Sequence, residues 1–248
     1  MRVVIPFDTY KGVADGSSLT IDRRKQILSV YEFVNSLGDE PLTYKTLQQK
    51  VATEDFGISE SAIRTFFPLL GKLGFVNYKD TFPASELFTK TGKTFMETFK
   101  SYLYAEELQP KRRLLDNEIN RCLMLLLRYG LLQMNEQKDF EQHGIWLAIA
   151  ILKQDKELFW PEFLYILYLV EEKKLSVKEA LEAAKTNRRN GVDYEFYNEE
   201  DKPIAGTSYS YTHAFLQEAG IVRDIELNHS ILEEGMDEYL ELIDNYYE

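Results

Sequence analysis

Apolar side chains recur at helical spacing along most of the chain. Between residues 21 and 37, for example, Ile27, Tyr31 and Val34 lie about one turn apart, and Gly38 follows them at a position that often ends a helix. Similar patterns predict further helices at residues 43–51, 59–73, 93–103, 117–132, 144–152, 161–173, 177–189, 209–219 and 236–246. We therefore predict a mainly α-helical protein.

Four stretches have a strand-like pattern instead. Residues 75–78 and 87–89 are rich in apolar and aromatic residues and flank a polar turn that contains a proline, which predicts a β-hairpin. A strand pair, or one bent strand, is predicted at residues 221–227, and a single strand at residues 2–6. The order helix, short helix, turn, helix, hairpin and helix is the plan of a winged helix-turn-helix, whose third helix can enter the major groove of DNA.

This order divides the chain into three predicted parts. Residues 1–110 form a first winged-helix subdomain, residues 111–157 a helical connector, and residues 158–248 a second winged-helix subdomain with an acidic C-terminal helix. Both wings are short β-hairpins. A charged loop is predicted at residues 194–206, within the second subdomain.

The net charge of −12 is unevenly distributed along the chain. Residues 1–190 hold 27 Lys and Arg against 26 Asp and Glu, whereas residues 191–248 hold 2 against 15. DNA affinity depends largely on cations that replace condensed counterions, so the average charge would argue against DNA binding. The nearly neutral body permits basic faces, and we expect the acidic tail to point away from any bound DNA.

Several kinds of chemistry are not indicated. The lone cysteine, Cys122, cannot form an internal disulfide, and its place in an apolar helix predicts that it packs in the core. Apolar runs are shorter than the ~20 residues that a bilayer requires, and no secretory leader is evident, so we expect a cytoplasmic protein without membrane contact. Three separated histidines predict no zinc site, and the chain has no phosphate-binding loop for a nucleotide.

A metal-dependent nuclease would need two acidic groups and a nearby lysine around Mg²⁺. Asp193 with residues 200–202, Glu-Asp-Lys, is the nearest match, but no apolar strand follows, and a solvated acidic loop explains it more simply. We therefore predict no catalytic residue, no metal ligand and no cofactor in this chain, and whether it belongs to an enzyme stays open.

Two phrases share one ending, in which a helix, a glycine and an apolar strand follow one another: residues 63–76, IRTFFPLLGKLGFV, and residues 211–222, YTHAFLQEAGIV. Together with FTKTGK at residues 88–93, and LSVKE at residues 175–179 after an apolar helix, they resemble the tandem winged-helix recognition domains of type IIS restriction endonucleases. The resemblance spans about residues 19–242 and implies sequence-specific recognition of duplex DNA. Those enzymes carry a separate nuclease domain, which we do not find here, so it implies a recognition fragment or a subunit whose partner nuclease supplies the Mg²⁺.

In this interpretation the polar residues on the third helix of each subdomain read bases, and basic clusters hold phosphates. The base-reading candidates are Ser59, Ser61, Arg64, Thr65, Ser210, Thr212 and His213. The phosphate-contact candidates are Arg23, Arg24, Lys25, Lys79, Lys90, Lys93, Lys111, Arg112, Arg113, Arg188 and Arg189. A solvated helix surface would contain the same residue types, and cations at the end of a helix also interact favourably with its dipole.

Two other functions fit the same pattern. The protein can be an interaction or regulatory subunit whose winged helices dock other proteins, with the acidic residues 236–248 facing a basic partner. It can also be a regulator of transcription or plasmid replication, since such proteins use tandem winged helices too.

Overall fold

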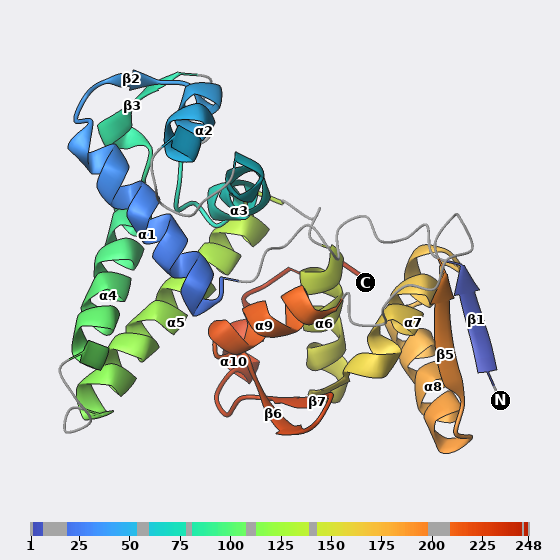
Figure 1. Cartoon of the computed structure of the whole chain (residues 1–248). Helices are drawn as coiled ribbons and strands as arrows, with labels where there is room; N and C mark the ends of the chain where they lie inside the picture. Colours follow the sequence, from blue (N-terminus) through green and yellow to red (C-terminus); the bar gives the residue numbers. More distant parts are fainter. Residues whose placement is uncertain are drawn as a thin grey trace. The chain divides into compact units, whose positions relative to one another are not determined.

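The computed structural model describes residues 2–6, 19–53, 60–77, 81–107, 113–138, 143–197, 209–244 and 246–247. The protein is mainly α-helical, as predicted (Figure 1). It consists of two compact units: residues 17–139, called the 17–139 unit, and residues 1–16 with 140–248, called the 140–248 unit. The two helices of the predicted connector fall in different units. No helix in the described ranges has the length and apolar content needed to cross a membrane.

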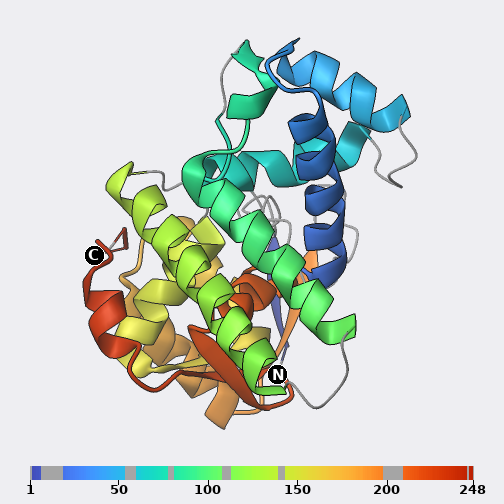
Figure 2. The same cartoon turned by 90° about the vertical axis from the view of Figure 1, so that its left-hand side faces the viewer.

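The 17–139 unit contains five helices within its described residues. Its elements are α1 (Ile21–Ser36), β2 (Pro41–Leu42), α2 (Tyr44–Thr53), α3 (Glu60–Lys72), β3 (Phe82–Pro83), the 3-10 turn η1 (Ala84–Glu86), α4 (Lys90–Glu107) and α5 (Arg113–Glu136). The helices predicted from apolar spacing are present, and Gly38, which follows α1, has a φ of +59° that suits glycine. Helices α4 and α5 lie side by side (Figure 2).

The strands of this unit differ from the predicted hairpin. Within the described residues, the two expected strands share a single bridge, Val76 to Phe88. Strand β3, in the expected turn, pairs instead with β2, and this places Leu42 opposite Phe82. Pro41 and Leu42, which precede α2, thus form a strand. Both Leu42 and Phe82 are buried, so this pairing of two distant segments removes their apolar side chains from water.

Aromatic side chains form the core between α1, α3, α4 and the bridged strands. Tyr31 and Phe88 meet edge to face at 5.1 Å, and Phe75 stacks on Phe95 at 4.9 Å. Gly92 permits the close approach of α4 to this core, because a Cβ there would lie 1.9 Å from the carbonyl oxygen of Phe75. Helix α4 is therefore held tightly against Phe75, which follows α3.

The prediction that Cys122 packs in the core was wrong, because this residue is exposed. The buried side of α5 consists of Leu123, Leu127, Leu131 and Met134, which recur every three or four residues. Cys122 precedes Leu123 by one position, and one residue turns a helix by about 100°, so its thiol lies off the buried stripe.

The 140–248 unit combines helices with two small sheets. Its elements are β1 (Arg2–Pro6), α6 (His143–Asp155), β4 (Glu157–Phe159), α7 (Trp160–Glu171), α8 (Val177–Arg189), β5 (Asp193–Tyr197), α9 (Ser210–Glu218), β6 (Val222–Glu226), β7 (His229–Leu232) and α10 (Asp237–Glu241). Helix α6 is buried from Gly144 to Leu152 and forms the centre of the unit. Ser176 and Glu179 form a reciprocal capping box at the start of α8.

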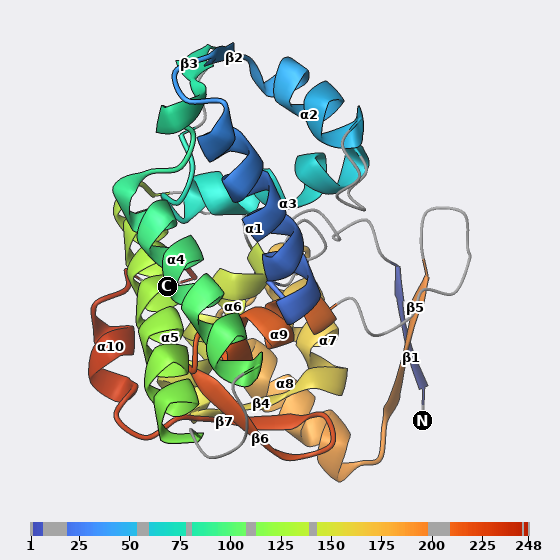
Figure 3. The same ribbon diagram turned by 60° about the vertical axis from the view of Figure 1, so that its left-hand side comes forward.

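Both sheets contain strands that the sequence did not reveal. Strand β6 pairs with β7 and β7 with β4, all antiparallel, whereas β1 pairs with β5 in parallel (Figure 3). The segment 221–227, predicted as a strand pair or one bent strand, therefore supplies a single strand of a hairpin. Residues 193–197 are a strand rather than part of a loop. The acidic helix predicted at 236–246 is shorter, because α10 ends at Glu241.

Candidate functional site

Helix α3 has one buried side and one exposed side. Ile63, Phe66, Phe67 and Leu70 are buried, whereas Arg64 is exposed. The structure thus places this base-reading candidate on the surface of the helix. The side chains of Ser61 and Thr65 and all of Ser59 lie outside the described residues.

The basic cluster at the start of α1 separates into different environments. Arg24 is buried, and its Nε donates to the carbonyl oxygen of Leu19 at 2.6 Å while its guanidinium lies 5.9 Å from the ring centres of both Phe95 and Phe99. Arg23 donates to Gln26 at 2.8 Å, and Lys25 is exposed. Arg24 therefore holds the start of α1 on the core, and only its neighbours face solvent.

An open groove of about 620 Å³ runs along α4. Its lining residues are Lys90, Lys93, Thr94, Glu97, Thr98 and Ser101. Lys93 donates to the carbonyl oxygen of Ser85 at 2.8 Å, and Glu97 accepts a hydrogen bond from Tyr31 at 2.9 Å. The groove brings together two phosphate-contact candidates, Lys90 and Lys93. Among the remaining phosphate-contact candidates, Lys79, Lys111 and Arg112 lie outside the described residues, as does the side chain of Arg113.

The polar residues of α9 have partners within the 140–248 unit. Thr212 is buried, and only Ser210 among the three candidates on this helix is exposed. His213 contacts Oδ1 of Asp224 through its Nε2 at 2.9 Å, and its ring packs on Trp160 at 4.6 Å. This helix therefore directs two of its three candidate side chains inward.

Ser230, His213 and Asp224 form a cluster that superficially resembles a catalytic triad. One nitrogen of His213, Nε2, lies near both the Asp224 carboxylate and Ser230 Oγ, whereas a triad uses the two ring nitrogens separately. Ser230 is fully buried, donates to Asp224 at 2.5 Å and accepts from Trp160 Nε1 at 2.7 Å. Burial alone would raise the pKa of Asp224, but hydrogen bonds from Ser230, His213 and Gln217 together lower it. The cluster joins α9 to the hairpin and leaves no activated nucleophile.

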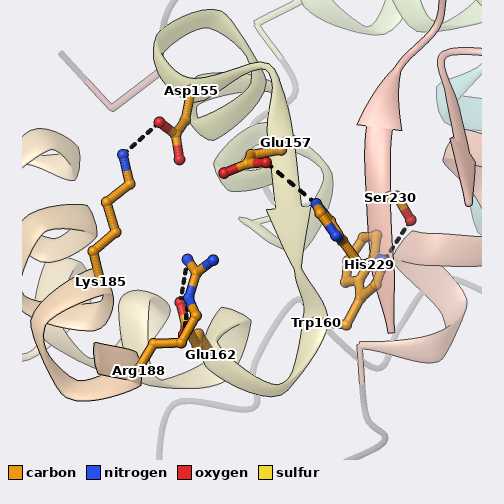
Figure 4. A network of polar contacts seen from close by, with 8 residues as sticks. All are labelled: Asp155, Glu157, Trp160, Glu162, Lys185, Arg188, His229 and Ser230. Atoms are coloured by element: carbon orange, nitrogen blue, oxygen red, sulfur yellow. Dashed lines mark hydrogen bonds and ion pairs between the residues drawn. The ribbon is translucent and has the colours of Figure 1, made fainter. Parts of the chain in front are cut away.

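A second polar network connects α6, β4, α7, α8 and β7 (Figure 4). Arg188 donates to both carboxylate oxygens of Glu162, from Nε at 2.7 Å and from Nη2 at 3.1 Å. Lys185 lies 2.5 Å from Asp155. Near them, His229 contacts Glu157 at 3.2 Å. Sequence reasoning missed this network because its members come from five separate elements.

The network encloses too little space for a substrate. The cavity beside Glu162 and Arg188 has a volume of about 10 Å³, roughly that of one water molecule. Burial raises the pKa of Glu162, and Arg188 offsets only part of this effect. The guanidinium of Arg188 also lies 3.3 Å from the ring centre of Phe159. Both Arg188 and its neighbour Arg189 are exposed, but Arg188 is engaged by Glu162 and by the ring of Phe159.

No group of three or more metal-ligating side chains converges within the described residues. Asp193 begins β5, and residues 200–202, with which it was compared, lie outside the described residues. No protein-family model matches the chain, and neither curated proteins nor solved structures show a significant similarity to it.

Proposed function

We propose that the 17–139 unit recognises duplex DNA as a winged helix-turn-helix, with α3 in the major groove. The observation that carries this proposal is the position of α3, which follows α2, buries its apolar side and leaves Arg64 exposed. The bridge between Val76 and Phe88 and the pairing of β2 with β3 support a wing beside this helix. An arginine on such a helix can donate two hydrogen bonds to a guanine.

The charge distribution between the units favours the same assignment. Residues 17–139 contain 17 Lys and Arg against 16 Asp and Glu, a net charge of +1, whereas the 140–248 unit contains 12 against 25, a net charge of −13. Phosphate binding requires local positive charge, so the nearly neutral unit is the better candidate. Arg23, Lys25, Lys90 and Lys93 are its proposed phosphate contacts.

The sequence resemblance supports the further proposal that this recognition serves the restriction of foreign DNA. In that setting another domain or a partner chain performs the cleavage and holds the Mg²⁺, and the present chain supplies sequence selection. Nothing in this proposal requires a nucleotide or a membrane.

The proposal is tested by selecting bound duplexes from a random pool with the full chain, and by measuring binding to the enriched site at several salt concentrations. Arg64→Ala should weaken binding to that site by about 1–3 kcal/mol and leave non-specific binding nearly unchanged. Arg121→Ala is the matched control, because Arg121 is an exposed arginine on α5 that pairs with Glu118. Lys90→Ala should reduce the salt dependence by about one released ion.

Two results would refute the proposal. The first is a pool without enrichment and no retarded complex even at low salt. The second is an enriched site whose preference survives Arg64→Ala, which would leave DNA binding in place but remove α3 as its reader.

A further inference from the structure

We infer that the β6–β7 hairpin of the 140–248 unit, residues 222–232, docks a partner protein through a basic polypeptide segment that carries apolar side chains. Leu227 at its tip is 92% exposed, and Ile225 in β6 is 44% exposed. Tyr211, on the preceding helix α9, is 44% exposed. Two of these large exposed apolar side chains, Ile225 and Leu227, lie two residues apart on the hairpin, and exposed apolar patches characterise contact surfaces.

The tip is held in place although its leucine faces solvent. Asn228, the second residue of the turn, has a φ of +62°, which asparagine tolerates better than most residues. Its side-chain oxygen accepts from Tyr209 at 3.1 Å, and its carbonyl oxygen accepts from the backbone of Trp160 at 3.0 Å. Leu227 is thus presented on an ordered turn, which lowers the entropic cost of docking.

The pairing of β6 indicates how a partner would make contact. The register between β6 and β7 shifts between Asp224 and Glu226, so Ile225 occupies a β-bulge. A bulge re-aims a side chain and makes an edge strand a poor template for a further strand. The partner is therefore expected to contact side chains of the hairpin rather than to extend the sheet.

Charge determines the chemistry of the partner. Residues 222–234 contain one cation, Arg223, and four acidic residues, Asp224, Glu226, Glu233 and Glu234. Arg223 lies 3.7 Å from Glu233, so the positive charge of Arg223 is partly neutralised by this carboxylate. A wing that meets DNA has to approach phosphates, which this surface would repel. A lysine- or arginine-rich segment with apolar side chains complements both its acidity and its exposed leucine.

The test uses the full chain and two synthetic probes, a peptide of leucine and lysine and a matched peptide of leucine and glutamate. Binding is measured by fluorescence anisotropy at about 0.15 M salt. The leucine–lysine peptide should bind and the leucine–glutamate peptide should not. The double variant Ile225→Glu with Leu227→Glu should weaken binding at least about tenfold, although it adds two negative charges. Leu242→Glu is the control, because Leu242 is 66% exposed in the same unit but outside the hairpin.

The design separates docking from simple attraction by net charge. Equal or tighter binding by the double variant would overturn the inference, because only charge would then matter. Failure of the wild-type chain to bind the leucine–lysine peptide would also overturn the inference. A double variant that loses DNA binding but keeps peptide binding would overturn it as well. The neutral variant Leu227→Asn, which should also weaken peptide binding, replaces the double variant if the latter does not fold.

Discussion

The ion pair between Glu162 and Arg188 should contribute strongly to the stability of the 140–248 unit. Glu162 is 5% exposed, and both of its carboxylate oxygens accept from Arg188. In the variant Arg188→Met the carboxylate stays buried but loses its cation. Breaking a buried pair in this way typically costs 3–5 kcal/mol. Because the Arg188 side chain is 34% exposed, water can replace part of the lost interaction, and we expect the substitution to lower the free energy of unfolding by about 3 kcal/mol.

The cost should also depend on pH. Burial raises the pKa of Glu162 above its ordinary value of 4.5 even with Arg188 present. A raised folded-state pKa means that this group's contribution to stability is present below the unfolded value and is lost as the pH rises through the folded value. Arg188 lowers the pKa of Glu162, so its removal raises the folded-state pKa of Glu162 further. The variant should therefore lose more stability at about pH 8 than at about pH 5.

Urea unfolding followed by tryptophan fluorescence measures this cost selectively. The chain has two tryptophans, Trp146 and Trp160, and both lie in the 140–248 unit. Arg189→Met is the control, since Arg189 is exposed at the same helix end, and it should change stability by less than about 0.5 kcal/mol. Replacing both partners by apolar residues, Glu162→Leu with Arg188→Met, should restore most of the loss. A cost below about 1 kcal/mol, or one that does not vary with pH, would refute the reasoning.

Three further predictions concern other parts of the chain. Gly92→Ala should destabilise the 17–139 unit by about 1–3 kcal/mol or more, because its Cβ would meet the Phe75 carbonyl; a circular dichroism melt that matches wild type would contradict this. A hydrogen bond from His143 lowers the pKa of Glu171 in the folded state below its ordinary value of 4.5. The ionised Glu171 therefore stabilises the fold above pH 4.5, and this contribution is lost as the pH falls through the lowered pKa. His143→Ala should therefore make tryptophan-detected unfolding less sensitive to acid, and an unchanged acid midpoint would argue against the contact. Cys122 should react with a thiol reagent as fast in native protein as in urea, and native protection would place it in the core after all.

Local signals in the sequence were sufficient for most helices. The spacing of Ile27, Tyr31 and Val34 places them on one buried side of α1, and Ser176 with Glu179 marks the start of α8. These signals act between residues within one or two helical turns, where the backbone hydrogen bonds are also made. A pattern of this kind therefore predicts structure without knowledge of the rest of the chain.

The formation of the strands depended on pairing partners that are far away in the sequence. Arg2 pairs with Asp193 in the β1–β5 sheet, and Glu157 with Ile231 in the sheet of the hairpin. Segments of two to five residues have little intrinsic preference of their own, because a strand is stabilised by what it packs against and pairs with. Only the tertiary structure could reveal β2, β4 and β5.

The candidate site shows the same limit for side chains. The sequence identified basic clusters by residue type, but type does not tell whether a cation faces solvent. In the folded protein Arg24 donates to the carbonyl oxygen of Leu19, and Arg188 donates to the buried carboxylate of Glu162. Arg64 and Lys90 are exposed. The physical reason is that burying a charge requires a partner from elsewhere in the chain, and only the folded protein brings that partner within hydrogen-bonding distance.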